Sequence, residues 1–257
     1  MSVIHYILAS APGVSDWSFV ALCLMSFLTS AVSAAFGLGG GAALLAVMAS
    51  VMPAIAIIPT HAVVQVGSNF FRAAMMWRNI LFTWMPAFVV GTVIGAIAGG
   101  YVVFALPRYA LQAIIGVFVL YAVWGPQIRA TRPSHPTFAV VGGLASFATM
   151  FAGATGPLIA PFIKASTGDR LQTVSTHAAF MSWQHGVKIL TFGFLGFTFG
   201  PYIPLLVAMI LFGIVGTWSG RFILHWMPEK VFRTGFNLVL TALALRLLYA
   251  AAVEIAA

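Results

Sequence analysis

Long apolar runs, separated by short links that contain polar residues, glycine or proline, make up almost the whole chain. A helix crosses the hydrocarbon core of a membrane with about 20 residues, and most of these runs are close to that length. The pattern predicts an all-α integral membrane protein with about ten membrane segments. We expect them at Trp17–Phe36, Ala42–Val51, Ile57–Trp77, Phe82–Phe104, Tyr109–Trp124, Phe138–Ala152, Leu158–Ala165, Leu171–Phe194, Tyr202–Leu224 and Val231–Ala251.

Two of the runs, Ala42–Val51 and Leu158–Ala165, are too short to cross a bilayer as helices, since a crossing needs about 17 residues or more. Each follows a glycine-containing cluster, at residues 37–41 and 153–157. Glycine permits a tight turn and a close approach of two backbones. We therefore expect two short broken or re-entrant helices that begin inside the membrane.

The composition agrees with a membrane protein, because 61% of the residues are hydrophobic and 6% are charged, whereas soluble domains carry about 25% charged residues. The net charge of +8 does not indicate nucleic-acid binding, since the basic residues stand singly between apolar runs and form no basic stripe. If the ten segments alternate across the membrane, most link cations fall on one side, which the positive-inside rule makes cytoplasmic. Both termini are then expected on the opposite side. The cations of the cytoplasmic side are Arg78, Arg129, Arg132, Lys164, Arg170, Arg221, Lys230 and Arg233.

The chain also aligns with itself at an offset of 116 residues. A glycine pair, a tripeptide and a cation that share one offset indicate an internal duplication rather than coincidence. The matched positions are Gly37 with Gly153, Gly40 with Gly156, the Thr-His-Ala stretch 60–62 with 176–178, and Arg72 with Lys188.

Each copy would contain five segments, and an odd number inserts the second copy upside down relative to the first. This is the inverted-repeat plan of secondary transporters, in which broken helices meet near the bilayer midplane and form the substrate site. We expect a first repeat at residues 1–125, a cytoplasmic link at 126–136 and a second, inverted repeat at 137–257. The duplication therefore favours transport over a membrane enzyme.

The two glycine clusters are the first candidate for the substrate site. The free amides at the start of a helix and the positive end of its dipole form an anion site without a charged side chain. Two such ends could hold one small anion from opposite sides, and the candidate residues are Gly39, Gly40, Gly41 and Ala42 in the first repeat and Thr155, Gly156 and Leu158 in the second. The alternative is that these glycines only allow close helix packing. We prefer that packing role for Gly91, Gly95 and Gly99, which are spaced by four.

Polar side chains on the two helices that follow are the second candidate. A polar stripe on a buried helix normally faces a cavity, and its residues are His61, Gln65 and Arg72 in the first repeat and His177, Gln184 and Lys188 in the second. The histidines could donate to an oxyanion or carry a coupled proton, or each could only bind a neighbouring carbonyl and hold two helices together. Arg72 and Lys188 could attract the anion, or they could extend to the membrane surface.

The residue patterns that several kinds of chemistry require are absent from the sequence. The acidic residues Asp16, Asp169, Glu229 and Glu254 all fall in links or at the termini, whereas a cation carrier would be expected to show an acid inside a span. No nucleophile with a paired base, phosphate-binding loop or zinc motif is present. We therefore predict no enzymatic activity, no cofactor and no metal. An intramembrane enzyme, an anion channel and a non-transporting assembly subunit remain as rivals.

With these features the sequence resembles the sulfite exporter TauE/SafE family of membrane permeases, from about Trp17 to Leu248. The resemblance rests on the Phe-Gly-Leu-Gly-Gly-Gly stretch 36–41 with Pro53, on the stretch 60–62, on the weaker copy from Gly153 and on Met227-Pro228. The second copy departs from the pattern, because Ala-Thr-Gly-Pro at 154–157 replaces a longer glycine run.

The resemblance implies a multi-pass carrier of the bacterial inner membrane, with periplasmic termini, that exports a small sulfur-containing anion such as sulfite or a C2 organosulfonate such as sulfoacetate. An ion gradient rather than ATP would drive it. A carrier for thiosulfate or a carboxylate is an alternative. The expected partners are the small anion and membrane lipid, with no nucleic acid, and a homodimer stays open.

Overall fold

The computed structural model describes residues 10–36, 39–103, 106–126, 128, 130, 134–223 and 229–256. These residues form α-helices and two short 3-10 helices, with no strand among them. The helices of the first half are α2 (Asp16–Phe36), α3 (Gly40–Val51), α4 (Ala54–Met75), η1 (Trp77–Asn79), α5 (Met85–Val103) and α6 (Arg108–Trp124). Those of the second half are α7 (His135–Ala152), α8 (Gly156–Ser166), α9 (Arg170–Phe194), η2 (Gly200–Tyr202), α10 (Ile203–Ile223) and α11 (Glu229–Ala256).

Every apolar run expected from the sequence corresponds to one of these α-helices, but the expected ten membrane segments are not confirmed. Within the described residues, six helices are long and apolar enough to cross a membrane, and these are α2, α4, α5, α7, α10 and α11. Helix α6 has only 17 residues. Helix α9 has 25 residues, but its polar residues lower its mean hydropathy. Helices α3 and α8, with 12 and 11 residues, are short, as predicted.

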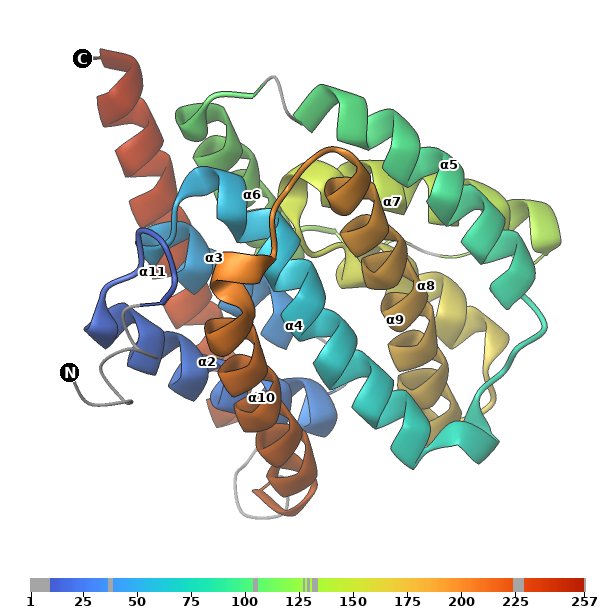
Figure 1. The fold of residues 1–257 in the computed structure, drawn as a ribbon. Helices are drawn as coiled ribbons and strands as arrows, with labels where there is room; N and C mark the ends of the chain where they lie inside the picture. The colour runs from blue at the N-terminus through green and yellow to red at the C-terminus, as the bar shows by residue number, and fades with distance from the viewer. Residues whose placement is uncertain are drawn as a thin grey trace.

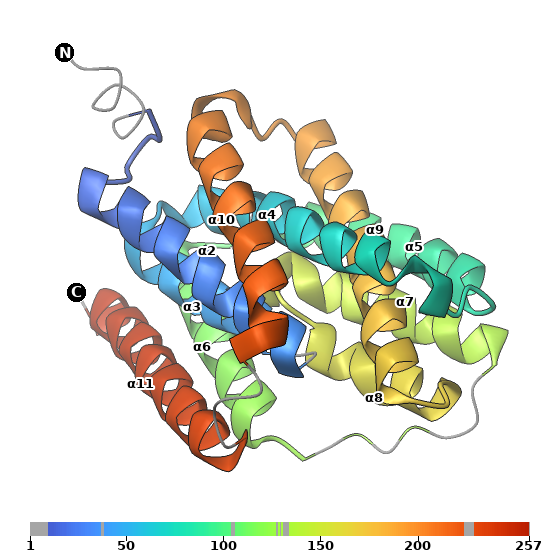
Figure 2. The same cartoon turned by 90° about the horizontal axis from the view of Figure 1, so that it is seen from below.

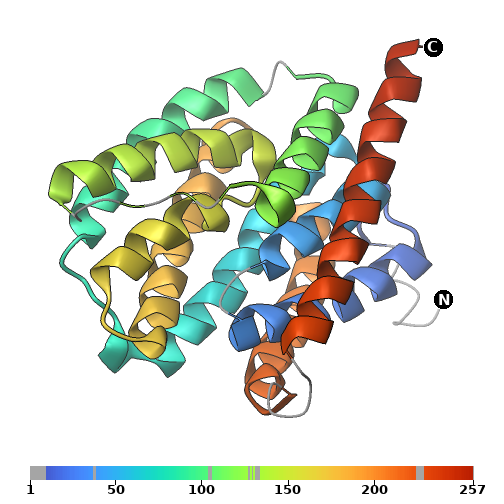
Figure 3. The same ribbon diagram turned by 180° about the vertical axis from the view of Figure 1, so that it is seen from behind.

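Helix pairing joins the two halves of the chain. Helix α2 packs along α10 and α5 packs along α7, so the first α-helix of each half lies beside the fourth α-helix of the other. Helices α4 and α9 pack against each other near the centre of the molecule, as Figures 1 and 2 show. Helices α6 and α11 lie side by side in the view from behind (Figure 3). Helices of the two halves are therefore interleaved.

Glycines allow an unusually close approach of the helices in the pairs α5 with α7 and α2 with α10. A Cβ atom built on Gly91 or Gly95 of α5 would fall on the carbonyl oxygen of Ala139 or Gly143 of α7. A Cβ atom on Gly216 of α10 would likewise fall on a carbonyl oxygen of α2. Small residues commonly allow such backbone contact in membranes. The predicted packing role of the α5 glycines is thus confirmed.

Candidate functional site

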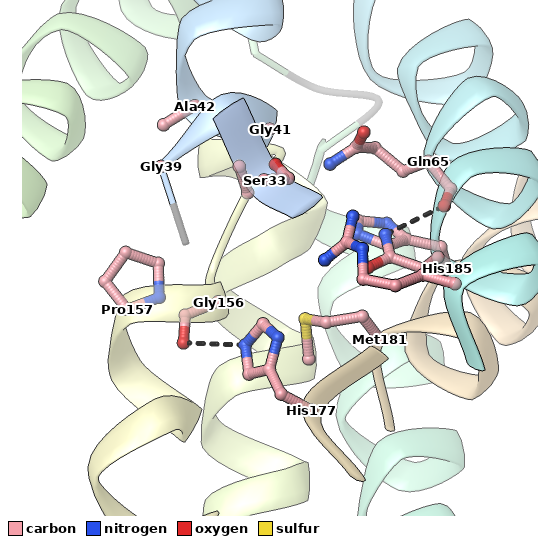
Figure 4. Close-up of a pocket in the computed structure, with 13 residues that line it drawn as sticks. Ser33, Gly39, Gly41, Ala42, Gln65, Gly156, Pro157, His177, Met181 and His185 are labelled. Atoms are coloured by element: carbon pink, nitrogen blue, oxygen red, sulfur yellow. Dashed lines mark hydrogen bonds between the residues drawn. The ribbon is translucent and has the colours of Figure 1, made fainter. Parts of the chain in front are cut away.

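Helices α3 and α8 begin at one shared cavity. Gly39, with a φ of 99°, precedes α3, and Gly153, with a φ of 70°, ends α7 and leads to α8. These left-handed conformations favour glycine, because a Cβ atom would strain them. Gly41 and Ala154 come so close that a Cβ atom on Gly41 would lie 4.0 Å from that of Ala154. Figure 4 shows the Gly39–Gly41 segment on one side of the space and Gly156 and Pro157 on the other.

The cavity has a volume of about 40 Å³. A buried water needs about 10–15 Å³, so the cavity holds about three waters or one small ion. Its walls come from both halves of the chain. They are formed by Ser33, Gly39, Gly41, Ala42, Gln65, Asn69, Arg72, Ala154, Gly156, Pro157, His177, Met181 and His185.

Backbone donors reach the cavity unequally from its two sides. In α3 the amide of Ala43 donates to the carbonyl of Gly39 (3.1 Å), so the amides of residues 40–42 precede the helical hydrogen bonds and have no partner inside the helix. In α8 the amide of Leu158 already donates to the carbonyl of Thr155 (2.9 Å). The expectation that Leu158 supplies a donor is therefore wrong, and proline at 157 has none. Gly156 remains as the donor of the α8 end.

Arg72 brings a positive charge into the wall of the cavity. Its side chain is only 3% exposed, so the alternative that it extends to the membrane surface is wrong. One guanidinium nitrogen lies 3.5 Å from the hydroxyl of Ser68, and Nε has no hydrogen-bond partner. Within the described residues no carboxylate pairs with Arg72, because the acids lie at helix ends. Arg72 is thus a buried cation that none of the described acidic side chains neutralises.

His61 and His177 each bind the carbonyl of the short helix in their own half. Nε2 of His61 lies 2.9 Å from the oxygen of Gly41, and Nε2 of His177 lies 3.3 Å from that of Gly156. A carbonyl only accepts, so Nε2 carries the proton in both rings, while both Nδ1 atoms are buried without a partner. The structural role considered from the sequence is therefore real for both histidines. Of these two histidines, His177 lines the cavity and His61 does not, as Figure 4 shows for His177.

Lys188, Gln184 and Thr155 support the break between α7 and α8 and do not line the cavity. The Lys188 ammonium, which is 0% exposed, donates to the carbonyl of Gly153 (2.7 Å) and the hydroxyl of Thr149 (3.2 Å). The Thr155 hydroxyl donates to Oε1 of Gln184 (3.2 Å). The alternative that Lys188 extends to the surface is wrong. Gly40 does not line the cavity either, because its α-carbon faces the carbonyl of Thr29 on α2.

Sequence reasoning missed several lining residues, namely Ser33, Asn69, Ala154, Pro157, Met181 and His185. The 116-residue offset would have found some of them. It pairs Asn69 with His185, the predicted Gln65 with Met181, and the predicted Gly41 with Pro157, and both members of each pair line the cavity. The alignment of the two halves therefore identifies more of the lining residues than a selection of glycine and polar residues does.

No cluster of metal-ligating side chains occurs within the part of the chain that the structure describes. Buried groups that are or can become positively charged gather instead around the cavity. The rings of His61 and His185 lie edge to face, with centroids 5.8 Å apart, and both lie within electrostatic range of Lys188. His177 lies within electrostatic range of Arg72. The arrangement can hold a negatively charged ligand.

These features define a multi-pass helical membrane protein with a cation-lined cavity at the meeting point of two short helices. Residues 22–247 match the family described as Sulfite exporter TauE/SafE, and the chain belongs to this family. No curated protein and no solved structure matches the chain significantly. The family consists of membrane transporters rather than enzymes, and its function is the membrane transport of sulfur anions such as sulfite.

Proposed function

We propose that the protein is a secondary transporter of a small sulfur-containing oxyanion, sulfite or a C2 organosulfonate such as sulfoacetate. It exports this anion from the cytoplasm by alternating access, and the anion rests in the cavity between α3 and α8. The observation that carries the proposal is Arg72, which lines the cavity, is buried and has no carboxylate partner among the described residues.

Burial of the charged Arg72 side chain is unfavourable in free energy. An ionised side chain away from water is strongly unfavourable unless a counter-charge or hydrogen bonds compensate it. An oxyanion supplies both, because guanidinium binds planar or tetrahedral oxyanions through paired N–H groups. The amides of Gly41 and Ala42 and the amide of Gly156 add donors from opposite sides, in the field of two helix dipoles. A cation placed there would meet only repulsion.

The inverted repeat is part of this proposal, with residues 1–125 and 137–257 as its two copies and 126–136 as the cytoplasmic link. The packing of α2 on α10 and of α5 on α7 supports it, since a twofold operation that exchanges the halves converts one pair into the other. The pairs α4 with α9 and α6 with α11 would lie across the same axis. The lining residues related by the 116-residue offset support it as well.

Contacts at the helix ends support the proposed orientation in a bacterial inner membrane. Arg170 donates to the carbonyl of Ala35 at the end of α2 (2.6 Å), and the hydroxyl of Ser175 donates to the carbonyl of Asn79 in η1 (3.0 Å). These bonds bring the ends that carry Arg78, Lys164 and Arg170 together, and this gathering of cations supports a cytoplasmic position for that face by the positive-inside rule. The termini would then be periplasmic.

Transport by the reconstituted protein tests the proposal. Proteoliposomes would be loaded with labelled sulfite, sulfoacetate or sulfate, and efflux would be followed with and without a pH gradient. We expect efflux of at least one sulfur anion by the wild type, a loss of about tenfold or more in Arg72→Gln, and normal efflux in Arg78→Gln, whose exposed side chain lies in η1. Removal of a charge-assisted bond justifies that magnitude. If no anion moves, or if Arg72→Gln transports normally, the proposal fails.

The same vesicles separate a carrier from an anion channel. A carrier shows saturable flux, and unlabelled anion on one side accelerates the movement of labelled anion from the other. A channel shows neither countertransport nor strong saturation. Thiosulfate and a small carboxylate such as acetate, added as competitors, would identify a carrier for another small anion.

A further inference from the structure

His185 is a further polar side chain in the cavity wall, and neither of its ring nitrogens has a hydrogen-bond partner among the described residues. The ring lies on α9, lines the cavity and is 2% exposed. Nδ1 is buried without a hydrogen bond, and no bond from Nε2 to a described residue occurs. Figure 4 shows the ring on the side of the cavity where Gln65 also lies. His185 therefore differs from His177, whose Nε2 is bound to Gly156.

The surroundings of His185 contain positive groups and no acid. Arg72 and His61 face this region from α4, and His177 and Lys188 lie on α9 itself. On the other elements packed against α9, the ionisable groups are exposed and do not line the cavity: Arg78 of η1, Tyr101 of α5, His135 of α7 and Lys164 of α8. A negative charge near His185 must consequently come from the ligand.

The charge balance of the cavity depends on the charge of that ligand. Arg72 is permanently charged and compensates one negative charge. The ammonium of Lys188 lies outside the cavity wall and is held by Gly153 and Thr149. An anion with two charges would therefore contact only one permanently charged side chain in the wall, and its second charge would have no cation in direct contact in a low-dielectric site, which is costly. His177 also lines the cavity with a free Nδ1, but its ring is fixed by the bond from Nε2 to Gly156. His185 is the described lining histidine whose ring makes no hydrogen bond, so it can face the anion and supply the second positive charge by taking up a proton.

We propose that His185 binds the anion directly and accepts a proton when the anion is doubly charged, so that a dianion is bound and carried together with one proton. The inference rests on the proposed function and adds its coupling ion. The proton comes from water on the side from which the anion arrives, resides on the imidazole of His185 while the site is filled, and leaves with the anion. A monoanion is bound by Arg72 and the amides without proton uptake.

Proton uptake on ligand binding tests this inference directly. The purified protein in detergent, weakly buffered at pH 7.5 with a pH indicator, would be titrated with thiosulfate or sulfoacetate as dianions and with methanesulfonate as a monoanion. We expect about one proton per bound dianion and none per bound methanesulfonate, since linkage requires proton uptake wherever binding favours the protonated form. His135→Gln is the matched control, because His135 is exposed at the start of α7, and it should behave as the wild type.

The variant His185→Gln keeps a neutral donor but cannot take the proton. We expect it to bind both dianions about 10- to 100-fold more weakly, without proton uptake, and to bind methanesulfonate nearly as well as the wild type. Dianion binding by the wild type without proton uptake overturns the inference even if the variant does not fold. Proton uptake that persists in a folded His185→Gln protein also overturns it. Absence of binding by all three probes and by sulfite would overturn the proposed function as well.

Discussion

The ammonium of Lys188 donates to the carbonyl of Gly153 at 2.7 Å, at the point where α7 ends and the chain turns toward α8. The last carbonyls of a helix have no partner inside it and carry the negative end of its dipole. Lys188 thus stabilises the break from which one half of the cavity is built. Its counterpart at the 116-residue offset, Arg72, lines the cavity instead.

Replacement of Lys188 by methionine should destabilise the protein although it removes a buried charge. The carbonyl of Gly153 and the hydroxyl of Thr149 would each lose a donor, and an unsatisfied buried polar group costs about 1–3 kcal/mol. We expect a lower thermal unfolding temperature of Lys188→Met in detergent. The exposed Lys164→Met on α8 serves as control and should unfold like the wild type. A more stable Lys188→Met protein would contradict this role.

Close packing of α5 on α7 makes Gly95 intolerant of any side chain. A Cβ atom there would overlap the carbonyl of Gly143, so Gly95→Ala should lower the free energy of unfolding by about 1–3 kcal/mol. The control is Gly186→Ala on α9, where a Cβ atom meets nothing within 4 Å. This substitution should be neutral or stabilise the helix by about 0.5–1 kcal/mol. Thermal unfolding of the two variants measures the contrast, and equal unfolding temperatures would rule out the backbone contact.

A methyl group on the cavity wall should impair transport more than stability. The Cβ atom of Gly41→Ala would overlap only Nε2 of Gln65, the end of a flexible side chain, and that of Gly156→Ala would lie 3.3 Å from the ring of His177. Both side chains can shift into the cavity, which has room for one small ion. We expect efflux to fall about tenfold or more while unfolding temperatures stay near that of the wild type. Normal efflux in both variants would show that the anion does not rest there.

His61 should behave as a residue that positions α3. Its Nε2 donates to the carbonyl of Gly41, so His61→Ala should lower the free energy of unfolding by about 1–3 kcal/mol. His61→Gln can restore a donor and should recover most of that loss, together with efflux. Circular dichroism during heating and vesicle efflux measure the two effects. Full efflux by a stable His61→Ala protein would argue against this positioning role.

The positions of the helices were predictable because a helix that crosses a membrane needs a long apolar run, which is visible in the sequence. The sequence indicated the short helices as well, since a run of the length of Ala42–Val51 after glycines cannot cross a bilayer. The boundaries shifted by a few residues, as at α11, which runs to Ala256 rather than Ala251. Met227 and Pro228, part of the family resemblance, lie outside the described residues, as do the link cations Arg129 and Arg132.

The site was predictable in part. Gly39 and Gly41 line the cavity as the broken-helix argument expected, and Gln65 and Arg72 line it as expected from the polar stripe. The contacts of the other predicted site residues depend on how each helix is rotated against its neighbours, and periodicity alone does not determine that rotation. A rotation of α4 against α3 decides that His61 meets a carbonyl, and the reach of one long side chain decides that Lys188 meets the end of α7. The prediction that Leu158 donates to the anion was wrong for a different reason, because its amide donates to the carbonyl of Thr155 in the first turn of α8.

The glycine contacts between α2 and α10 and between α5 and α7 also constrain how the molecule can rearrange. Each contact presses backbone against backbone, so sliding one helix of a pair along the other would require the pair to separate first. Each pair contains one helix from either half of the chain. In the proposed transport cycle, any bodies that rock against each other would therefore contain helices of both halves, and a boundary in the middle of the sequence would not be a hinge between two moving domains.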